Sequence, residues 1–466
     1  MLRASVAAEA AGIPSVSLVC EGFQRQALAT GRGLGFDGMR LAVLRGHVDA
    51  QSADEMIASL IAHTLDEVIE GLTVALPDAG DAMTEPAALD PAATGTIDEI
   101  NRVFCERGWS DGHPIIPPTR ERVEALIAEW GYDPWRVIDV ARPSGRDITV
   151  WSIAVNAVMA GLAAEYLPVV MALASALADP SYGVEHSGNT TGADALVVLN
   201  GGVVADLGFN HGPGAMRDGT YANTAIGRWV RLFLRNVCGF TAEEHDKGTF
   251  GHSAHVVLAE DEAALREIGW PSLAADFAHQ SGDDAVTVAR INSGVLIGSV
   301  FGSTPEAIIP YLADGLVRVT GWELTHVYGL GQGQYRPLLV LSPLLARTFA
   351  RAGWSKDDVR AALFQAARIP AWKFEAYIGE WSNLTAGRRT LVELCAAGLV
   401  PADFAVSDDP NRLVPIVTSA DQFLIAVAGD PNRANATAMS NDGLHGQWTS
   451  KPIDRHYSTD LMCSIN

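Results

Sequence analysis

The sequence lacks any run of about 18 uncharged apolar residues, the length that a helix needs to span a membrane. Its N-terminus also lacks a basic segment followed by a hydrophobic core, so we expect neither a membrane span nor a signal peptide. Basic residues are scarce: 33 Lys and Arg stand against 55 Asp and Glu, and the formal net charge is −22. This balance argues against nucleic acid or an anionic membrane as the main partner, and the expected location is cytoplasmic.

Cysteine motifs and nucleotide fingerprints are also missing. Five cysteines are scattered along the chain without a CxxC spacing, which fits reduced thiols better than disulfides or a zinc knuckle. Neither GxxxxGK[ST] nor a properly placed GxGxxG occurs, so the sequence carries no nicotinamide or flavin signature. Apolar material is plentiful: 48% of the 466 residues are hydrophobic, enough for large cores in roughly two to four domains.

Alternating strand and helix patterns predict an α/β fold, with a small flavodoxin-like N-terminal unit and a larger α/β domain. We expect residues 1–73 to form the small unit and residues 98–466 the large domain, with a subdivision near 280–340 as an alternative. Residues 74–97 are rich in Ala, Pro and Asp, which is typical of a linker. The sequence shows no internal repeat with a fixed period.

Short apolar runs predict the strands, and helical periodicity predicts the helices. Strands are expected at 13–19, 39–44, 195–199, 255–260, 286–291, 338–341 and 423–427. Helices are expected at 22–31, 52–72, 98–107, 120–130, 149–162, 166–177, 224–237, 304–316 and 342–352, with a further one capped by Ser355. The segment after Gly429 is rich in Asn, Gly and Ser, so we expect a loop there.

The chain is organised around the strand at 195–199, the Gly-rich loop that follows it and the helix at 224–237. Asn223 stands at the predicted N-cap, where backbone N–H groups and the helix dipole favour an anion. Arg228, Arg231 and Arg235 share one helical face, which predicts a carboxylate or phosphate site; the alternative is that they pair with acidic residues. The residues of this stretch predicted to bind substrate are Asn210, Asp218, Asn223, Arg228 and Arg235.

Five of the twelve histidines lie in one short part of the chain, at His186, His211, His245, His252 and His255. If they converge, their imidazoles would suit zinc, copper, iron or nickel, so a divalent transition metal is a candidate cofactor. The metal ligands would be His186, His252 and His255. Their spacing matches no recognised ligand motif, and surface histidines are the alternative.

Candidates for acid–base chemistry lie in the same segments. Asp111 is in a Gly- and Pro-rich loop, where a stiff backbone holds side chains, and His245 and Asp246 form part of an ionisable run. A carboxylate beside a histidine tunes the pKa of the imidazole toward neutrality, as a general base requires. We therefore predict catalytic roles for Asp111, His211, His245 and Asp246, with solvated turns as the alternative.

Cys20 is a separate catalytic candidate, because it follows the first strand just before a helix, and a helix N-terminus lowers the pKa of a thiol. The alternative is a packed, inert thiol. Polar groups near the central strand and helix complete the predicted substrate site, although as turn residues they would only satisfy backbone groups. These additional residues are His113, Thr190, Thr191 and Lys247.

Four motifs occur in the order expected for one family: 107–119 (RGWSDGHPIIPPT), 154–161 (AVNAVMAG) with 165–168 (EYLP), 222–228 (ANTAIGR) and 246–251 (DKGTFG). With them the chain resembles the UGSC family of selenoprotein-like proteins, most clearly over residues 12–272. In that family a selenocysteine or cysteine, then Gly, Ser and Cys, ends a first strand. This motif does not precede residues 9–16 here, so the resemblance implies kinship without a thiol or selenol reductase role.

From these features we expect an enzyme of the lyase or hydrolase type that acts on a small anionic molecule in a cleft between the two domains. We also expect a homo-oligomer. The competing hypothesis is a non-catalytic ligand-binding or partner subunit of a UGSC-type redox assembly whose redox motif lies on another chain. A histidine-lined polar cavity would favour the enzyme, and an exposed sheet edge at 13–19 would favour the partner subunit.

Overall fold

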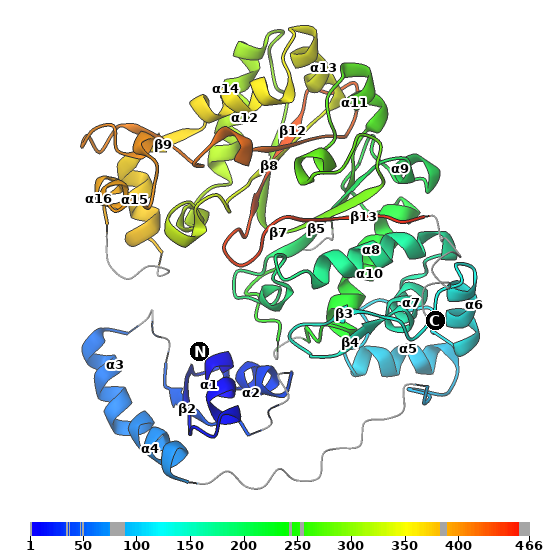
Figure 1. The fold of residues 1–466 in the computed structure, drawn as a ribbon, viewed down its shortest axis with the longest axis vertical. Helices are drawn as coiled ribbons and strands as arrows, with labels where there is room; N and C mark the ends of the chain where they lie inside the picture. The colour runs from blue at the N-terminus through cyan, green and yellow to red at the C-terminus, as the bar shows by residue number, and fades with distance from the viewer. Residues whose placement is uncertain are drawn as a thin grey trace, which may run out of the picture.

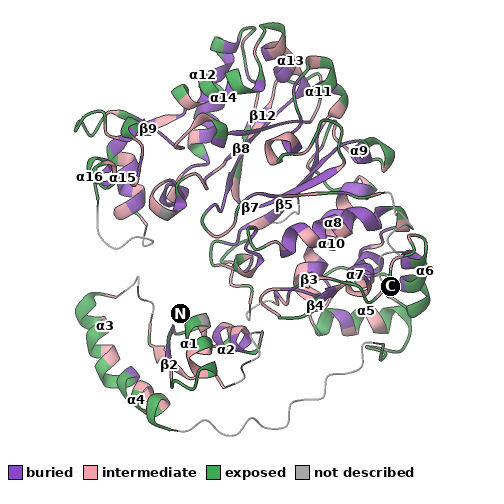
Figure 2. Cartoon of the chain, viewed as in Figure 1, coloured by how far each residue is buried: buried purple, intermediate pink, exposed green. Residues whose placement is uncertain are grey.

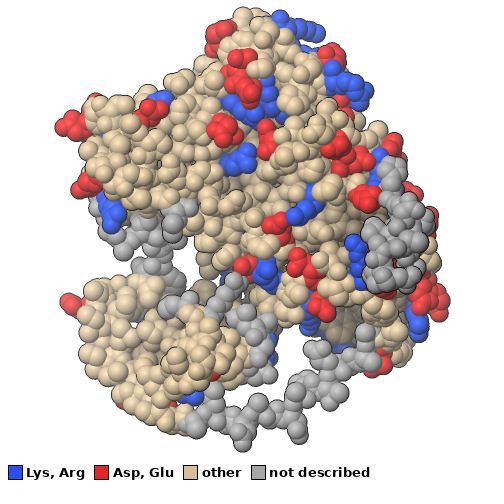
Figure 3. Space-filling model, in the orientation of Figure 1, with Lys and Arg blue, Asp and Glu red and all other residues tan. Residues whose placement is uncertain are grey.

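The computed structural model describes residues 2–33, 36, 38–46, 48, 51–74, 89–241, 245–251, 256–382 and 389–455. These residues form an α/β fold with one large curled sheet covered by helices, and a separate small sheet near the N-terminus (Figure 1). Most of the predicted linker lies outside the described residues. Figure 3 shows basic and acidic side chains interspersed over the larger part of the molecule. No helix within the described ranges is long and apolar enough to cross a bilayer.

The N-terminal residues form a small unit with its own sheet, drawn in blue in Figure 1. β1 (Ser17–Cys20) pairs in parallel with β2 (Leu41–Leu44), as the alternation of strand and helix predicts. The helices of this unit are α1 (Leu2–Ala10), α2 (Gln24–Gly33), α3 (Ala53–Ser59) and α4 (Leu65–Thr73). The predicted helix at 52–72 is confirmed as α3 and α4, joined by one π-helical turn, Leu60–Thr64, and begun by a Ser52 capping box.

The large sheet has the strand order β6-β5-β7-β12-β8-β11, and β13 lies beside the first half of β7. Its strands are β5 (Asp194–Asn200), β6 (Val256–Ala259), β7 (Ala285–Ile297), β8 (Leu338–Leu341), β11 (Leu424–Val427), β12 (Ala436–Asn441) and β13 (Thr449–Pro452). The apolar runs predicted as strands between 195 and 427 are confirmed. The prediction of a loop after Gly429 is wrong, because this segment contains β12, which is central to the sheet. Its small and polar residues have low strand propensity, and pairing with β7 and β8 on its two sides imposes the conformation.

Two three-stranded units of the same topology build this sheet. In each unit the first and second strands are parallel neighbours, and the third is antiparallel on the other side of the first: β5, β6 and β7, then β8, β11 and β12. The registers correspond, since Glu260 N–H donates to the Leu199 carbonyl and Ala428 N–H donates to the Leu341 carbonyl. In this alignment Ile291 corresponds to Asn441, and the two are paired with each other. A pseudo-twofold axis therefore passes through that pair and relates the two units. The sequence does not reveal this repeat of topology.

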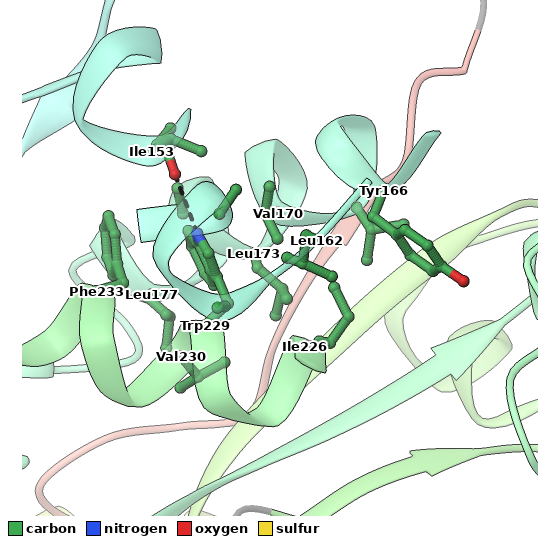
Figure 4. Packing of buried hydrophobic residues seen from close by; sticks show 14 of the residues in the cluster. Ile153, Leu162, Tyr166, Val170, Leu173, Leu177, Ile226, Trp229, Val230 and Phe233 are labelled. Atoms are coloured by element: carbon green, nitrogen blue, oxygen red, sulfur yellow. Dashed lines mark hydrogen bonds between the residues drawn. The ribbon is translucent and has the colours of Figure 1, made fainter. Parts of the chain in front are cut away.

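The sheet curls until its two edge strands meet, since Asp261 N–H, just after β6, donates to the Val427 carbonyl of β11. Apolar side chains from all six strands fill its inner face. The outer face of the first unit is covered by α7 (Val150–Ala160), α8 (Leu167–Ala178) and α10 (Tyr221–Asn236), and that of the second by α12 (Pro305–Arg318), α13 (Pro343–Arg351) and α14 (Lys356–Ala366). β5, β8 and β11 are accordingly almost completely buried (Figure 2). In the first helical layer the buried Trp229 indole donates to the Ile153 carbonyl at 3.1 Å (Figure 4).

The remaining elements are short. They are the helices α5 (Ile97–Glu106), α6 (Arg120–Ala128), α9 (Val203–Asp206), α11 (Glu262–Ile268), α15 (Ala371–Gly379) and α16 (Leu391–Ala396), and the antiparallel pairs β3 (Val137–Val140) with β4 (Asp147–Thr149) and β9 (Arg368–Pro370) with β10 (Leu413–Pro415). The helix predicted to begin after Ser355 is α14, and the Ser355 side chain accepts a hydrogen bond from the Asp358 N–H as predicted.

Candidate functional site

Four ionisable side chains converge where the two three-stranded units meet. Arg290 belongs to β7, Asp442 follows β12, His445 lies three residues further on, and His326 ends the 3-10 helix η6 (Trp322–His326). Asp442 N–H donates to the Arg290 carbonyl at 2.9 Å, so strand pairing itself brings two of the four together. We call Arg290, His326, Asp442 and His445 the Asp442 cluster.

Asp442 is completely buried and connects the cluster. Its Oδ1 lies 2.9 Å from His445 Nδ1, and its Oδ2 accepts a hydrogen bond from Asn189 Nδ2 at 2.8 Å. Arg290 Nη2 is 3.7 Å from the same Oδ2. Burial acts to raise the pKa of Asp442, but the contact with His445 and the charge of Arg290 outweigh it and leave the pKa below its usual value. The carboxylate is therefore ionised at neutral pH.

Backbone carbonyls hold the buried guanidinium of Arg290. Its Nη1 donates to the carbonyls of Tyr182, at 3.0 Å, and Gly183, and the group lies 5.5 Å from the centroid of the Tyr182 ring. Glycine makes this close approach possible, because a Cβ at Gly446 would overlap the Tyr182 carbonyl, and Gly183 has a φ of +62°. Arg290 Nε and Nη2 have no hydrogen-bond partner within the described part of the chain.

His326 is the most deeply buried imidazole of the cluster, with 1% of its surface exposed. Burial lowers the pKa of His326 to about 4, so the ring is neutral at pH 7. The ring packs edge-to-face on Trp322 and lies 5.8 Å, centroid to centroid, from that of His445. Its Nδ1 has no hydrogen-bond partner among the described residues. Buried polar atoms usually have a hydrogen-bond partner, and a bound ion would explain why this ring nitrogen has none.

A second buried layer, centred on Glu323, fixes η6 against β12. Glu323 Oε1 accepts from the Ser440 hydroxyl at 3.0 Å, and Oε2 accepts from the Gly321 N–H at 2.9 Å. The Ser440 hydroxyl also lies 2.8 Å from that of Ser293 in β7. Burial raises the pKa of Glu323. Because Glu323 precedes His326 by three residues, this network sets the position of the imidazole.

His186, one of the three predicted metal ligands, lies next to the cluster. It ends the 3-10 helix η4 (Val184–His186), and its ring centroid is 5.1 Å from that of His445. The other two predicted ligands, His252 and His255, lie outside the described residues. Among the residues that the structure describes, the group with metal-ligand geometry is His326, Asp442 and His445, and the sequence predicted none of the three.

A cavity of about 210 Å³ opens beside the cluster. Its ionisable lining is Arg231, Arg235, Asp194 and Asp246. Two further lining positions connect it to the cluster: Ser187 follows His186, and Ala195 pairs with Arg290 across β5 and β7. The cavity is therefore a neighbour of the Asp442 cluster, although none of the four cluster residues is among its lining residues. A larger cavity, about 340 Å³, lies over α6 and α7 and carries only Arg122 and Glu129 as ionisable groups.

The two arginines of the cavity differ in how they are held. Arg231 Nη2 lies 3.0 Å from Asp194 Oδ2, so its charge is paired, as the alternative hypothesis for the arginine face proposed. Arg235 Nη1 donates to the Gly108 carbonyl at 3.2 Å. Arg235 Nε is buried and has no hydrogen-bond partner in the described ranges. Arg235 is therefore held by a backbone carbonyl, whereas Arg231 is held by a carboxylate.

Two loops bring several predicted site residues to this cavity. Lys247 N–H donates to the Gly188 carbonyl at 2.9 Å, and Thr249 N–H donates to the Thr190 carbonyl at 3.1 Å, which joins 187–192 to 245–251. The Thr191 hydroxyl donates to Asn189 Oδ1 at 2.7 Å, and Asn189 in turn donates to Asp442. The predicted residues on these loops are Thr190, Thr191, His245, Asp246 and Lys247, and of these Asp246 lines the cavity.

The Gly-rich loop differs from the prediction at the start of its helix. α10 begins at Tyr221 with Thr220 as N-cap, so Asn223 is not the N-cap. The buried Asn223 side chain instead accepts from the Asn210 N–H at 2.8 Å and donates to the Val257 carbonyl at 3.0 Å, which ties the loop to β6. These bonds occupy the polar groups predicted to bind an anion, and Asp218 on the same loop is exposed. The Asn223 side chain therefore ties the loop to the sheet.

His211 forms a second histidine–carboxylate pair on this loop. Its Nδ1 lies 3.6 Å from Oδ2 of Asp261, which follows β6. The interaction with Asp261 raises the pKa of His211 against the opposing effect of burial. The pair lies at the carboxyl ends of β5 and β6, whereas the Asp442 cluster lies where β7 meets β12.

Arg228 and Asp111 bind each other rather than presenting charge to a ligand. Arg228 Nε donates to Asp111 Oδ2 at 2.9 Å and Nη2 donates to Oδ1 at 3.0 Å, and Nη2 also reaches the Pro114 carbonyl at 2.7 Å. Burial acts to raise the pKa of Asp111, but the guanidinium outweighs it and lowers the pKa. The pair ties α10 to the loop that carries the exposed His113. This tie gives Asp111 and Arg228 a structural role.

Cys20 ends β1, and the loop that follows it touches the larger part of the molecule. Lys247 Nζ donates to the Gly22 carbonyl at 3.1 Å and lies 5.8 Å from the centroid of the Phe23 ring. Two predicted site residues, Cys20 and Lys247, thus lie on segments that contact each other.

Sequence reasoning missed the whole Asp442 cluster. Its members come from separate segments that only the fold brings together, and two of them lie in the stretch predicted to be a loop. The signal that could have revealed them is the run Asn441-Asp442-Gly443-Leu444-His445-Gly446, where a carboxylate and an imidazole are spaced between glycines.

Comparison with known families gives one match. Residues 1–74 match the UGSC family. The UGSC match covers the small N-terminal unit from α1 to α4 and confirms the predicted resemblance there. The motifs quoted between 107 and 251 lie beyond the UGSC match, so kinship in that part stays a prediction. No curated protein and no solved structure matches the chain significantly.

Proposed function

We propose that this chain is an enzyme that acts on a small carboxylated or otherwise anionic substrate by a lyase or hydrolase type of reaction. The observation that supports it most directly is that the cavity lined by Arg231 and Arg235 lies next to the Asp442 cluster. Proton transfer to or from a bound anion needs an anion pocket beside imidazole and carboxylate groups.

The anionic group of the substrate would bind at Arg235. Arg235 lines the cavity, and a guanidinium grips a carboxylate through two parallel donors. Arg231 would add charge from the same helical face while Asp194 holds it in place. Because pockets for drug-sized ligands measure about 300–1,000 Å³, a cavity of about 210 Å³ favours a smaller molecule.

The reacting end of the substrate would lie toward His186 and His445. The His445 side chain is 35% exposed, whereas its partner Asp442 is completely buried behind it. A buried carboxylate that orients an accessible imidazole serves a general base or a metal ligand. The His211–Asp261 pair is the rival position for the chemistry, because it has the same composition.

Turnover of a panel of small hydroxycarboxylates, dicarboxylates and their esters and amides, followed by NMR, tests this proposal. We expect hydrolysis or elimination of at least one member. In the His445→Asn variant kcat should fall about 100-fold or more, the range attributed to general acid–base groups. The His211→Asn variant, compared in parallel, decides between the two histidine–carboxylate pairs.

The anion pocket has its own readout in the same assay. Replacing Arg235 by Met should raise KM about tenfold or more through loss of a charge-assisted hydrogen bond. Arg146→Met is the matched control, since Arg146 donates to the Asn236 carbonyl at the end of the same helix but does not line the cavity. Equal KM values for the two variants, or full activity of His445→Asn, would contradict the proposal.

A partner subunit is the second candidate function, and the small N-terminal unit carries the observation that favours it. β1 has a strand neighbour on one side only in the described part of the chain. The outer edge of β2 is by contrast blocked, because Val43 donates its N–H to Glu67 at 2.7 Å and accepts from Thr64 at 2.8 Å. An open edge beside a blocked one suits the addition of a strand from another chain.

The same unit exposes an apolar stripe along α3 and α4. Its members are Ile57, Ile61, Leu65, Ile69 and Leu72, each between 45% and 65% exposed. Exposed side chains at helical spacing favour burial against another molecule, and we propose a homo-oligomer on this basis. The masses of the full chain and of an Ile61→Lys variant, measured by light scattering, test this proposal. If both proteins have the mass of one chain, the homo-oligomer is contradicted.

A further inference from the structure

Three of the four residues of the Asp442 cluster, His326, Asp442 and His445, could together hold a metal ion. One potential ligand atom from each of His326, Asp442 and His445 lies within 4.8 Å of the other two. His445 Nδ1 and Asp442 Oδ1 are 2.9 Å apart. Two ligand atoms that each bind one ion at about 2.1 Å are separated by about 3.0 Å in an octahedral site and about 3.4 Å in a tetrahedral one, so this pair needs to move apart by about 0.5 Å at most.

A second observation comes from His326 itself. Its side chain is buried, yet Nδ1 has no hydrogen-bond partner among the described residues. Leaving a buried polar atom unpaired carries a free-energy cost, so such atoms are uncommon. The packing of the ring on Trp322 and the Glu323 network hold the imidazole in this position. A bound ion is the partner that would satisfy it.

We propose that His326, Asp442 and His445 bind one divalent transition-metal ion, with zinc, iron, cobalt or nickel as the class. Two imidazoles and one carboxylate suit these ions, and three protein ligands leave coordination positions for water or substrate. Asn189 donates to Asp442 Oδ2 and would orient the carboxylate from outside the coordination shell. The chemical role of this ion rests on the proposed function, whereas its binding does not.

Binding changes the hydrogen bonding inside the cluster. The His445–Asp442 contact would be exchanged for two bonds to the ion, which requires the proton of the neutral His445 ring to sit on Nε2 if Nδ1 is the ligand atom. Arg290 opposes the ion, since its Nη2 is 3.7 Å from Asp442 Oδ2. The ion and Arg290 together would leave the site net positive with one carboxylate among its ligands. That charge suits the anionic substrate proposed for the adjacent cavity.

Titration of the chelator-treated, untagged full chain with Co²⁺ tests this assignment without any substrate. We expect about one Co²⁺ per chain, with visible d–d absorption bands that Zn²⁺ abolishes by competition. His445→Asn and Asp442→Asn should each weaken the affinity about tenfold or more, since each removes one of three ligands. His211→Asn is the matched control, because it alters the other histidine–carboxylate pair, and it should bind Co²⁺ like the wild type.

Three results would overturn the assignment: far less than one Co²⁺ per chain, unchanged affinity in His445→Asn, or loss of binding in His211→Asn alone. Circular dichroism of each variant separates loss of a ligand from loss of the fold. The proposed function can fail separately. Stoichiometric Co²⁺ without turnover of any small carboxylate would leave the ion site intact and remove the reaction. Turnover by a protein that binds no Co²⁺ in the titration would do the reverse.

Discussion

Asp111 and Arg228 show how a single ion pair determines the role of two predicted site residues. Their side chains are 7% and 21% exposed and share two hydrogen bonds. We expect Asp111→Asn to lower the free energy of unfolding at pH 7 by about 2 kcal/mol, because it leaves a largely buried guanidinium without its counter-charge. Urea unfolding monitored by tryptophan fluorescence measures the change.

The pH dependence of this effect follows from the direction of the pKa shift. The pKa of Asp111 is lowered in the folded protein, so the pair stabilises the fold above the usual Asp pKa of about 4. That stabilisation is lost as the pH falls through the lower folded-state pKa, and the difference between wild type and variant should shrink there. A difference that stays constant to pH 3 would contradict this. The exposed pair of Arg120 and Glu124 on α6 is the control, and Glu124→Gln should have no measurable effect.

Residue roles could be predicted from the sequence only where partners are close in the chain. The Ser355 cap was predictable, since its partner Asp358 lies three residues away. Asp111 and Arg228 are more than a hundred residues apart, and their helix and loop gave no sign that they pair. For the same reason His186 was named as a candidate, while its neighbour His445 was not. A residue type indicates what chemistry is available, and the fold alone decides which groups share a site.

At the scale of elements, Asn223 ties the Gly-rich loop to the sheet, and this can be tested. Replacement by Ala would leave the Asn210 N–H and the Val257 carbonyl without their partner. We expect the free energy of unfolding to fall by about 2 kcal/mol. Hydrogen exchange at the Asn210 amide should accelerate to the same extent, since its acceptor is removed.

Thr224→Ala is the matched control on the neighbouring residue. The Thr224 hydroxyl accepts from the Gly219 N–H at 2.9 Å, an exposed bond to the same loop. Because water can replace this partner, the Ala variant should cost far less stability and leave exchange at Asn210 unchanged. Equal effects for the two variants would show that the buried tie is not what holds the loop.

The elements themselves were predicted well where local pattern and burial agree. The strand at 195–199 and the helices of the first layer carry apolar residues at the expected periods, and the fold buries them. β12 fails this test, because Ala436-Thr437-Ala438-Met439-Ser440-Asn441 has few strongly apolar side chains. Its conformation comes from pairing on both sides, which is tertiary information. The missed strand is also the element that positions Asp442.

At the scale of the whole molecule, the pseudo-twofold axis explains where the Asp442 cluster lies. β7 and β12 are the corresponding third strands of the two units, and they pair with each other at the axis. Asp442 follows the residue on this axis, and Arg290 precedes its counterpart. Side chains from both units therefore come together there. This arrangement resembles an interface between two subunits, a usual place for a ligand site.

The same topology predicts opposite outcomes for two truncations of the chain. Residues 2–74 contribute no strand to the large sheet, whereas the segment after 429 supplies β12 at its centre. We expect the 89–466 fragment to be soluble and to unfold cooperatively within a few degrees of the full chain, and the 1–429 fragment to lack cooperative unfolding. Removal of β12 would separate β7 from β8 and expose two unpaired strand edges beside buried apolar side chains. Differential scanning calorimetry of both fragments measures this. A cooperative transition in the 1–429 fragment would show that the large sheet folds without β12. The absence of a cooperative transition in the 89–466 fragment would show that the large sheet needs the N-terminal unit.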